Sequence, residues 1–318
     1  MDIVLTFFLL ALGITLLVKG SDVFVEASAG IARNFKVPNL IIGMTIMAFG
    51  TSAPEAFIGV RAALDGTVAL AMGNVIGSDI FNLIFIIGLA AVVTPMAINF
   101  KTIAKDYGVA ISGPILLLLM MLSFDEYIPR MGGTLFLVMF FCYLVIVIRS
   151  TLRKRKEGFE LEEEVEENTH SLKRNALFAI LGLGAIILGG ELTVHHAVYI
   201  AELLGMSARV IGLTIVATGT SLPELIIVFM ASKRRENELA IGNIIGSSIF
   251  NILFVLGLAG VISPLPIESG LIFDLTFLLG ASVMFLIFVL TKKKLARFEG
   301  FVMVVSYLVY LSYVVWWQ

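Results

Sequence analysis

Cysteine is nearly absent from this sequence, since Cys142 is the only one among 318 residues. The chain can therefore form no disulfide bond within itself. Histidine is also scarce, with three in all, and the sequence contains neither an H-E-x-x-H zinc motif nor a G-x-S-x-G nucleophile motif. These absences argue against a metalloprotease or a hydrolase, and we expect that the protein is not an enzyme.

Charge is scarce as well, because only 14% of the residues are charged while 59% are hydrophobic. Ordinary soluble domains contain about 45–50% apolar residues. Apolar runs of about 17–25 residues, the length that crosses a hydrocarbon core of roughly 30 Å, recur along the chain. We count ten of them, at residues 3–18, 40–60, 69–94, 107–123, 132–148, 175–190, 210–231, 239–263, 272–290 and 300–317. The sequence therefore predicts an all-α integral membrane protein with ten transmembrane helices, surrounded by lipid and without a nucleic-acid partner.

Basic residues are nearly missing from one side of the expected membrane, where only Arg61, Arg130 and Arg209 of the 22 Lys and Arg residues fall. All the others flank the opposite side, including Lys19 and Arg33, which we place in the loop after the first span. Loops rich in Lys and Arg stay in the cytoplasm. We therefore expect a cell-membrane protein whose two termini lie outside and whose charged linker, residues 149–174, is cytoplasmic.

The chain also repeats itself at an offset of 169 residues. "GMTIMAFGTSAPE" (residues 43–55) superposes on "GLTIVATGTSLPE" (212–224), and "GNVIGSDIFN" (73–82) on "GNIIGSSIFN" (242–251). The linker divides the chain into residues 1–148 and 175–318, each with five spans. Because five is odd, the two halves must cross the membrane in opposite senses. This predicts two inverted-topology repeats, an arrangement in which substrates bind at the midplane between the halves.

A carboxylate and a proline fall together inside the second and seventh spans, as Glu55 with Pro54 and Glu224 with Pro223. A carboxylate near the bilayer centre costs roughly 2.5–3.5 kcal/mol or more, so it needs a partner or a wet cavity. No basic residue in the buried segments can pair with either one, which leaves a cation or a proton. Proline removes a backbone donor, so we expect the helix to break and carbonyl groups of residues 48–51 and 217–220 to turn toward an ion.

The third and eighth spans add hydroxyl and amide oxygens. Ser78 and Asn82 are four residues apart and share one helix face, as do Ser247 and Asn251. Oxygen-only ligands suit Ca²⁺ or Na⁺ rather than a soft transition metal. Small and polar residues also allow helices to pack closely, which is the alternative reading of these positions taken alone. Two glutamates beside prolines at equivalent positions favour an ion site.

These paired motifs resemble the alpha-repeats of the sodium/calcium exchanger family, and the resemblance covers nearly the whole chain. It implies Na⁺-driven Ca²⁺ transport by alternating access, with no cofactor, and a gate formed by the first and sixth helices. It implies that Glu55 and Glu224 are the principal Ca²⁺ ligands. The implied Na⁺ ligands are Thr51, Ser52, Thr220, Ser221, Ser78 and Ser247, joined by the carbonyl groups of Ala48 and Ala217.

Two positions depart from the family pattern. Many relatives have Asp where this chain has Asn251, and Asp79 stands where relatives often have Asn or a small residue. On a helix, Asp79 lies about 100° from Ser78 and about 60° from Asn82, so it flanks the ligand face. We retain Asp79 as a candidate ligand. The alternatives are a Ca²⁺/H⁺ exchanger that uses the same glutamates and, from a different class, a cation channel; we expect a monomer.

Overall fold

The computed structural model describes residues 3–35, 39–66, 68–156, 171–203, 217–292 and 294–317. The described part is almost entirely helical. Its first half contains α1 (Ile3–Phe35), α2 (Asn39–Ile42), the π-helix η1 (Gly43–Met47), α3 (Ala48–Thr51), α4 (Ala53–Leu64), α5 (Val68–Ile80), the π-helix η2 (Phe81–Ile86), α6 (Ile87–Val93), β1 (Met96–Ala97), α7 (Phe100–Ser123), β2 (Tyr127–Ile128) and α8 (Arg130–Lys156). The second half contains α9 (Leu172–Leu203), α11 (Ala217–Thr220), α12 (Leu222–Lys233), α13 (Asn237–Ile249), the π-helix η4 (Phe250–Leu256), α14 (Gly257–Ile262), β3 (Leu265–Pro266), α15 (Ser269–Lys292), β4 (Lys294–Leu295) and α16 (Arg297–Trp317).

The helices have the length and composition of membrane spans. Within the described residues, eight helices are long and apolar enough to cross a bilayer, and the bent pair Leu40–Thr51 and Ala53–Leu64 provides a ninth. The predicted run at residues 210–231 begins outside the described residues and continues into α11 and α12. The chain is thus a helical, multi-pass membrane protein, as the apolar runs predict.

The first and sixth predicted spans are wrong in length. They were expected to end near residues 18 and 190, whereas α1 and α9 continue as unbroken helices of 33 and 32 residues. Lys19 and Arg33 therefore lie inside α1 and not in a loop. The apolar run stops early because the second half of α1 carries polar residues, and these are tolerated where they meet polar partners.

One such partner is Arg234, which follows the last turn of α12. Its Nη2 and Nε atoms donate to Asp22 Oδ1 at 2.6 and 2.9 Å, and Nη2 also lies 3.3 Å from Glu26 Oε2. Partial burial lowers the pKa of Arg234, but the hydrogen bonds and charges of Asp22 and Glu26 outweigh burial and leave it raised. We call this contact the Arg234 ion pair, and it fastens α1 to the end of α12.

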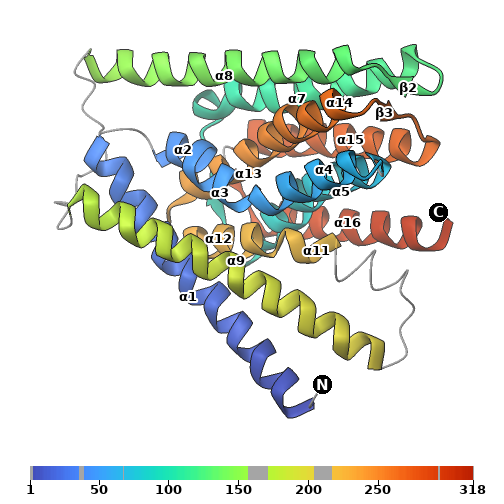
Figure 1. The fold of residues 1–318 in the computed structure, drawn as a ribbon. Coiled ribbons are helices and arrows are strands. Elements are labelled where there is room, and N and C mark those ends of the chain that lie inside the picture. The colour runs from blue at the N-terminus through green and yellow to red at the C-terminus, as the bar shows by residue number, and fades with distance from the viewer. Residues whose placement is uncertain are drawn as a thin grey trace.

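α1 and α9 lie side by side and cross the rest of the molecule obliquely (Figure 1). Glycines let their backbones touch. A Cβ atom on Gly20 would lie 2.9 Å from the Gly182 carbonyl oxygen, and one on Gly182 would lie 2.9 Å from that of Gly20. Gly13 and Gly189 face each other in the same way, at 3.0 and 2.7 Å. Such close contact along two long helices makes α1 and α9 one unit.

The remaining helices pack in pairs that repeat between the halves. Elements 169 residues apart have equivalent neighbours: α3 packs on α13 and α11 on α5, α4 on α14 and α12 on α6, α8 on α14 and α16 on α6. The two short sheets follow the same rule. β1 pairs antiparallel with β4 and β2 with β3, so that Met96 faces Leu295 and Ile128 faces Leu265. Each sheet therefore joins one half of the chain to the other.

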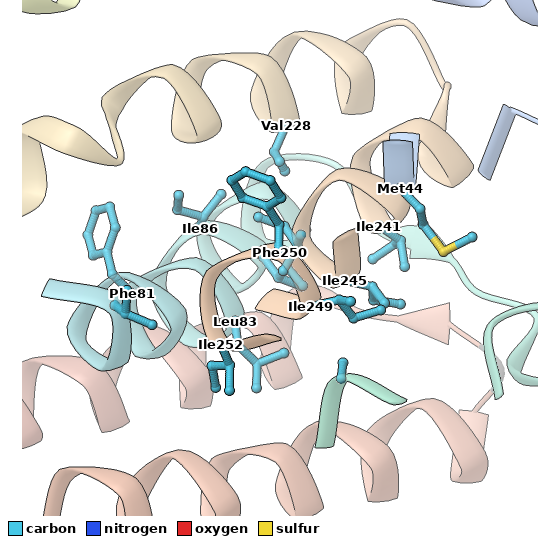
Figure 2. Close-up of a cluster of buried hydrophobic side chains, with 14 of the residues drawn as sticks. Met44, Phe81, Leu83, Ile86, Val228, Ile241, Ile245, Ile249, Phe250 and Ile252 are labelled. Atoms are coloured by element: carbon cyan, nitrogen blue, oxygen red, sulfur yellow. The ribbon is translucent and has the colours of Figure 1, made fainter. Parts of the chain in front are cut away.

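An apolar core surrounds the polar centre of the molecule. Figure 2 shows part of it, where Phe81 and Ile86 of η2, Val228 of α12 and Ile249 and Phe250 along α13 and η4 gather. Of these, Ile86 and Val228 are completely buried. Burial of this kind stabilises the fold by about 25 cal/mol per Å² of apolar surface. It also keeps water away from the polar residues on the same helices.

Candidate cation-binding site

Both predicted helix breaks are present, and they occur at equivalent residues. Ser52 separates α3 from α4 with φ −87° and ψ 10°, and Ser221 separates α11 from α12 with φ −91° and ψ 7°. In each case proline follows in the first turn of the next helix, where its missing N–H costs nothing. The first pair of helices bends by 50° at the break. The glutamates Glu55 and Glu224 consequently lie in the first turn of α4 and α12.

The expectation that the break frees the Ala48 carbonyl is wrong. That oxygen accepts the Ser52 amide at 3.0 Å and the Thr51 hydroxyl at 3.2 Å. The carbonyl that loses its donor is Gly50, four residues before Pro54. The break is only one residue long, so the helix closes its last turn before it bends. The surroundings of Ala217, the equivalent residue, lie outside the described residues.

The two glutamates are completely buried, with 0% exposure each. They interact across the interface between the halves, close enough for their charges to repel. The Ser52 hydroxyl of the first half donates to Glu224 Oε1 of the second at 3.1 Å, while Thr220 of the second half interacts with Glu55. No Lys or Arg is among the buried side chains of the described part. The structure thus places two carboxylates together without a basic partner.

The remaining predicted ligands are also buried, and many of their polar atoms have no partner. Ser78 and Ser247 lie on α5 and α13, whereas Asn82 and Asn251 lie in the π-helices η2 and η4 that follow. π-helical segments are rare and often mark functional sites. Within the described residues, hydrogen-bond partners are lacking for Glu55 Oε1 and Oε2, Glu224 Oε2, Ser78 Oγ, Ser221 Oγ, Ser247 Oγ, Asn82 Oδ1 and Nδ2, and Asn251 Oδ1.

Buried polar atoms in proteins are normally hydrogen-bonded, so a cluster of unsatisfied oxygens requires an explanation. A bound cation supplies one, because it satisfies carboxylate, hydroxyl and amide oxygens at once. The described residues contain no group of three or more His, Cys, Asp or Glu side chains that would suit a transition metal. The donor set therefore fits Na⁺ or Ca²⁺, as the sequence predicts.

Asp79 touches the candidate site without facing it squarely. Its Oδ1 atom accepts the Asn251 side-chain amide at 3.1 Å, and the residue is 1% exposed. Asp79 thus meets, from the first half, the residue that replaces an aspartate of the second. The amide nitrogen of Asn251 is turned toward Asp79, which leaves its unpartnered oxygen directed elsewhere.

One site residue was missed from the sequence. Asn243, on α13, is completely buried, and its Oδ1 atom accepts the Thr51 hydroxyl from the other half at 3.4 Å. The signal was present, because Asn243 lies in the duplicated motif "GNIIGS" and one turn before Ser247 on the same helix face. Its counterpart Asn74 also has a buried side-chain nitrogen without a partner among the described residues.

Comparison with known proteins agrees with this site. The family model described as "Sodium/calcium exchanger protein" matches residues 5–149 and 175–316. The chain belongs to the sodium/calcium exchanger family. Members of this family are transporters, and the exchanger fold accounts for the two matched stretches on either side of the linker.

Individual exchangers are similar over nearly their whole length. The sodium/calcium exchanger MaX1 of Methanosarcina acetivorans is 30% identical over 97% of this chain and 98% of its own. The inner membrane protein YrbG of Escherichia coli is 33% identical over 82% of this chain and 81% of its own. A solved structure of the sodium-calcium exchanger NCX_Mj, soaked with 10 mM Na⁺ and zero Ca²⁺, superposes with a TM-score of 0.84 at 31% identity and covers 99% of this chain and 100% of the other.

The site makes a direct prediction about its two carboxylates. Glu55→Gln and Glu224→Gln should each lower Ca²⁺ uptake into proteoliposomes by at least about 100-fold. Removing one charge from a buried ionic cluster costs about 3–5 kcal/mol, which corresponds to that factor or more. The matched control is Glu299→Gln, which neutralises a buried carboxylate on α16 outside the site and should transport normally. Near-normal uptake by either site variant would contradict the assignment.

Proposed function

We propose that the protein exchanges Na⁺ for Ca²⁺ across the cell membrane by alternating access. The observation that carries the proposal is the pair of fully buried glutamates, one from each half, without a basic partner in the described residues. Two carboxylates neutralise one Ca²⁺, and the same two charges balance two Na⁺ ions. Competition between the ions for one set of oxygens couples their movements.

The oxygen ligands other than the carboxylates favour Na⁺ over protons as the driving ion. A proton carrier needs only the two glutamates, because protonation neutralises them without further donors. Here the glutamates are surrounded by the buried hydroxyls of Ser52 and Ser221 and the amides of Asn82 and Asn251. These groups replace the hydration shell that a Na⁺ ion loses on entering a dry site.

Burial of the site also favours an exchanger over a channel. Glu55, Glu224, Ser52 and Asn251 all have 0% exposure, so the ligands are closed off from water in this conformation. An open pore would leave its ion ligands in contact with water. An alternating-access transporter instead passes through a closed state and opens to one side at a time.

The moving part that we propose is the α1–α9 unit. Its two helices are held together by glycine contacts but meet the rest of the molecule along fewer elements, chiefly α12 and α2. Together with the matched packing of the halves, this supports two five-span repeats of opposite orientation in a ten-span protein, with both termini outside and the linker cytoplasmic. In this arrangement the Arg234 ion pair lies on the cytoplasmic side.

The Arg234 ion pair has no equivalent in the other half. The residue 169 positions before Arg234 is Asp65, and the one that follows Asp22 by the same offset is Glu191, so two acidic residues take the places of an acid and a base. Asp65 pairs instead with Arg61 on its own helix at 2.7 Å. The ion pair therefore restrains α1 on one side of the membrane only.

The driving ion is tested by imposing one gradient at a time. Proteoliposomes loaded with Na⁺ and diluted into Na⁺-free medium should take up Ca²⁺, because outward Na⁺ movement drives the exchange. A pH gradient in choline medium should drive little uptake, and a Na⁺ ionophore should abolish the Na⁺-driven signal. If the pH gradient suffices and Na⁺ has no effect, the protein is a Ca²⁺/H⁺ exchanger. If Ca²⁺ passes without a counter-ion and does not saturate, it is a channel.

Movement of α1 is tested by breaking the Arg234 ion pair. Arg234→Gln should accelerate Na⁺-driven Ca²⁺ exchange by about 1.5- to 5-fold, since a partly exposed ion pair contributes about 0.2–1 kcal/mol to holding α1 in place. The gain should shrink at high salt. Arg61→Gln is the matched control, because it breaks an ion pair confined to one helix. Equal rates for both variants and the unaltered protein would rule out a restraining role.

A further inference from the structure

The carboxylate of Asp79 has two different sides. One oxygen, Oδ1, accepts the Asn251 amide at 3.1 Å and so contacts the transport site. The other, Oδ2, is buried and has no hydrogen-bond partner among the described residues. The hydroxyl of Ser248, on α13, interacts with the same carboxylate. A buried carboxylate oxygen without a partner is the kind of group that holds an ion or a water molecule.

A closed cavity borders this side of Asp79. Its volume is about 20 Å³, and it lies between α5, α7, α13 and α15. A cavity of about 10–15 Å³ is enough for one water molecule, so this one admits a single guest of that size. Its polar lining consists of Asp79, Tyr107, Ser248 and Ser282, together with Ala110, and Pro114 also borders it.

The lining offers oxygen atoms that are not committed elsewhere. The Tyr107 hydroxyl donates its proton to the Ser282 carbonyl oxygen at 2.7 Å, which leaves the lone pairs of the hydroxyl oxygen available. Pro114 lies inside α7 and has no N–H, so the carbonyl group of Ala110, four residues earlier, loses its intrahelical donor. Proline therefore supplies a free carbonyl here, as it does at Gly50 in the transport site.

Charge decides what the guest must be. No Lys or Arg is among the buried side chains of the described part, so Asp79 has no basic partner there. A small cation bound by a carboxylate, a freed carbonyl and hydroxyl oxygens balances the charge, and the size of the cavity selects a dehydrated Na⁺. We propose that the cavity behind Asp79 is a Na⁺ site, separate from the site between Glu55 and Glu224.

This inference rests on the proposed exchange function, to which it adds one Na⁺ ion that supports the transport site. An ionised Asp79 holds the amide nitrogen of Asn251 and so turns the Asn251 oxygen away from itself. The site exists in one half only, because Ser248 and Val283 occupy the positions 169 residues after Asp79 and Pro114. One extra Na⁺, and not two, is therefore expected.

Thermal unfolding of purified protein without Ca²⁺ tests the proposal, because a bound ion raises the unfolding midpoint. The double variant Glu55→Gln/Glu224→Gln should still be stabilised by Na⁺ relative to choline, and addition of Asp79→Asn should abolish that response. K⁺ should not replace Na⁺. Asp274→Asn, which removes a half-buried carboxylate bonded to Tyr310, is the matched control and should leave the response unchanged.

A milder variant covers the possibility that the triple variant does not fold. Tyr107→Phe in the double-variant background should raise the Na⁺ concentration for half-maximal stabilisation by about 5- to 10-fold, because one ligand oxygen is lost. Loss of the Na⁺ response in the double variant itself would overturn the proposal, as would an equal response to K⁺. Failure of Na⁺-driven Ca²⁺ uptake would instead refute the exchange function, so the two failures are distinguishable.

Discussion

The structure depends on one electrostatic constraint, which is the burial of two carboxylates in a membrane without a basic side chain beside them. Glu55 and Glu224 are excluded from water, and their charges repel each other. The cost of burying an unpaired charge is several kcal/mol even after the protein relaxes. A protein that retains both glutamates must supply a cation or a proton. The unsatisfied hydroxyl and amide oxygens around them belong to the same solution.

Neither half of the chain can meet this constraint alone. Each half contributes one glutamate, one broken helix and one π-helical segment, and the hydrogen bond from Ser52 to Glu224 crosses between them. The packing of equivalent helices and the two short sheets bring the halves together from both sides. The α1–α9 unit lies outside this core, so it can shift while the ligands stay in place.

The duplicated motifs allowed much of the site to be predicted. Glycine, serine and proline at a fixed offset predict the breaks at Ser52 and Ser221, because proline acts on its own helix and needs no distant partner. The same local logic failed where a distant residue decides the outcome. The continuation of α1 past Lys19 depends on Arg234, more than 200 residues later, which no local pattern reveals.

The surroundings of Asp79 show the same limit. Helix geometry predicts the direction of Asp79 relative to Ser78 and Asn82, but it cannot predict the cavity formed by three other helices. The Ala48 carbonyl was also misjudged, since the helix keeps its last hydrogen bond before the break. The side of the membrane on which the linker lies remains a prediction from the distribution of Lys and Arg.

The most direct measurement of the central claim is an experimental structure with Sr²⁺ or Ca²⁺ bound. Anomalous diffraction should show one divalent ion between the halves, with Ca²⁺ about 2.3–2.6 Å from an oxygen of Glu55 and from an oxygen of Glu224. Replacement of the divalent ion by Na⁺ should remove that signal. A divalent ion held by only one of the two glutamates, or located away from both, would contradict the account.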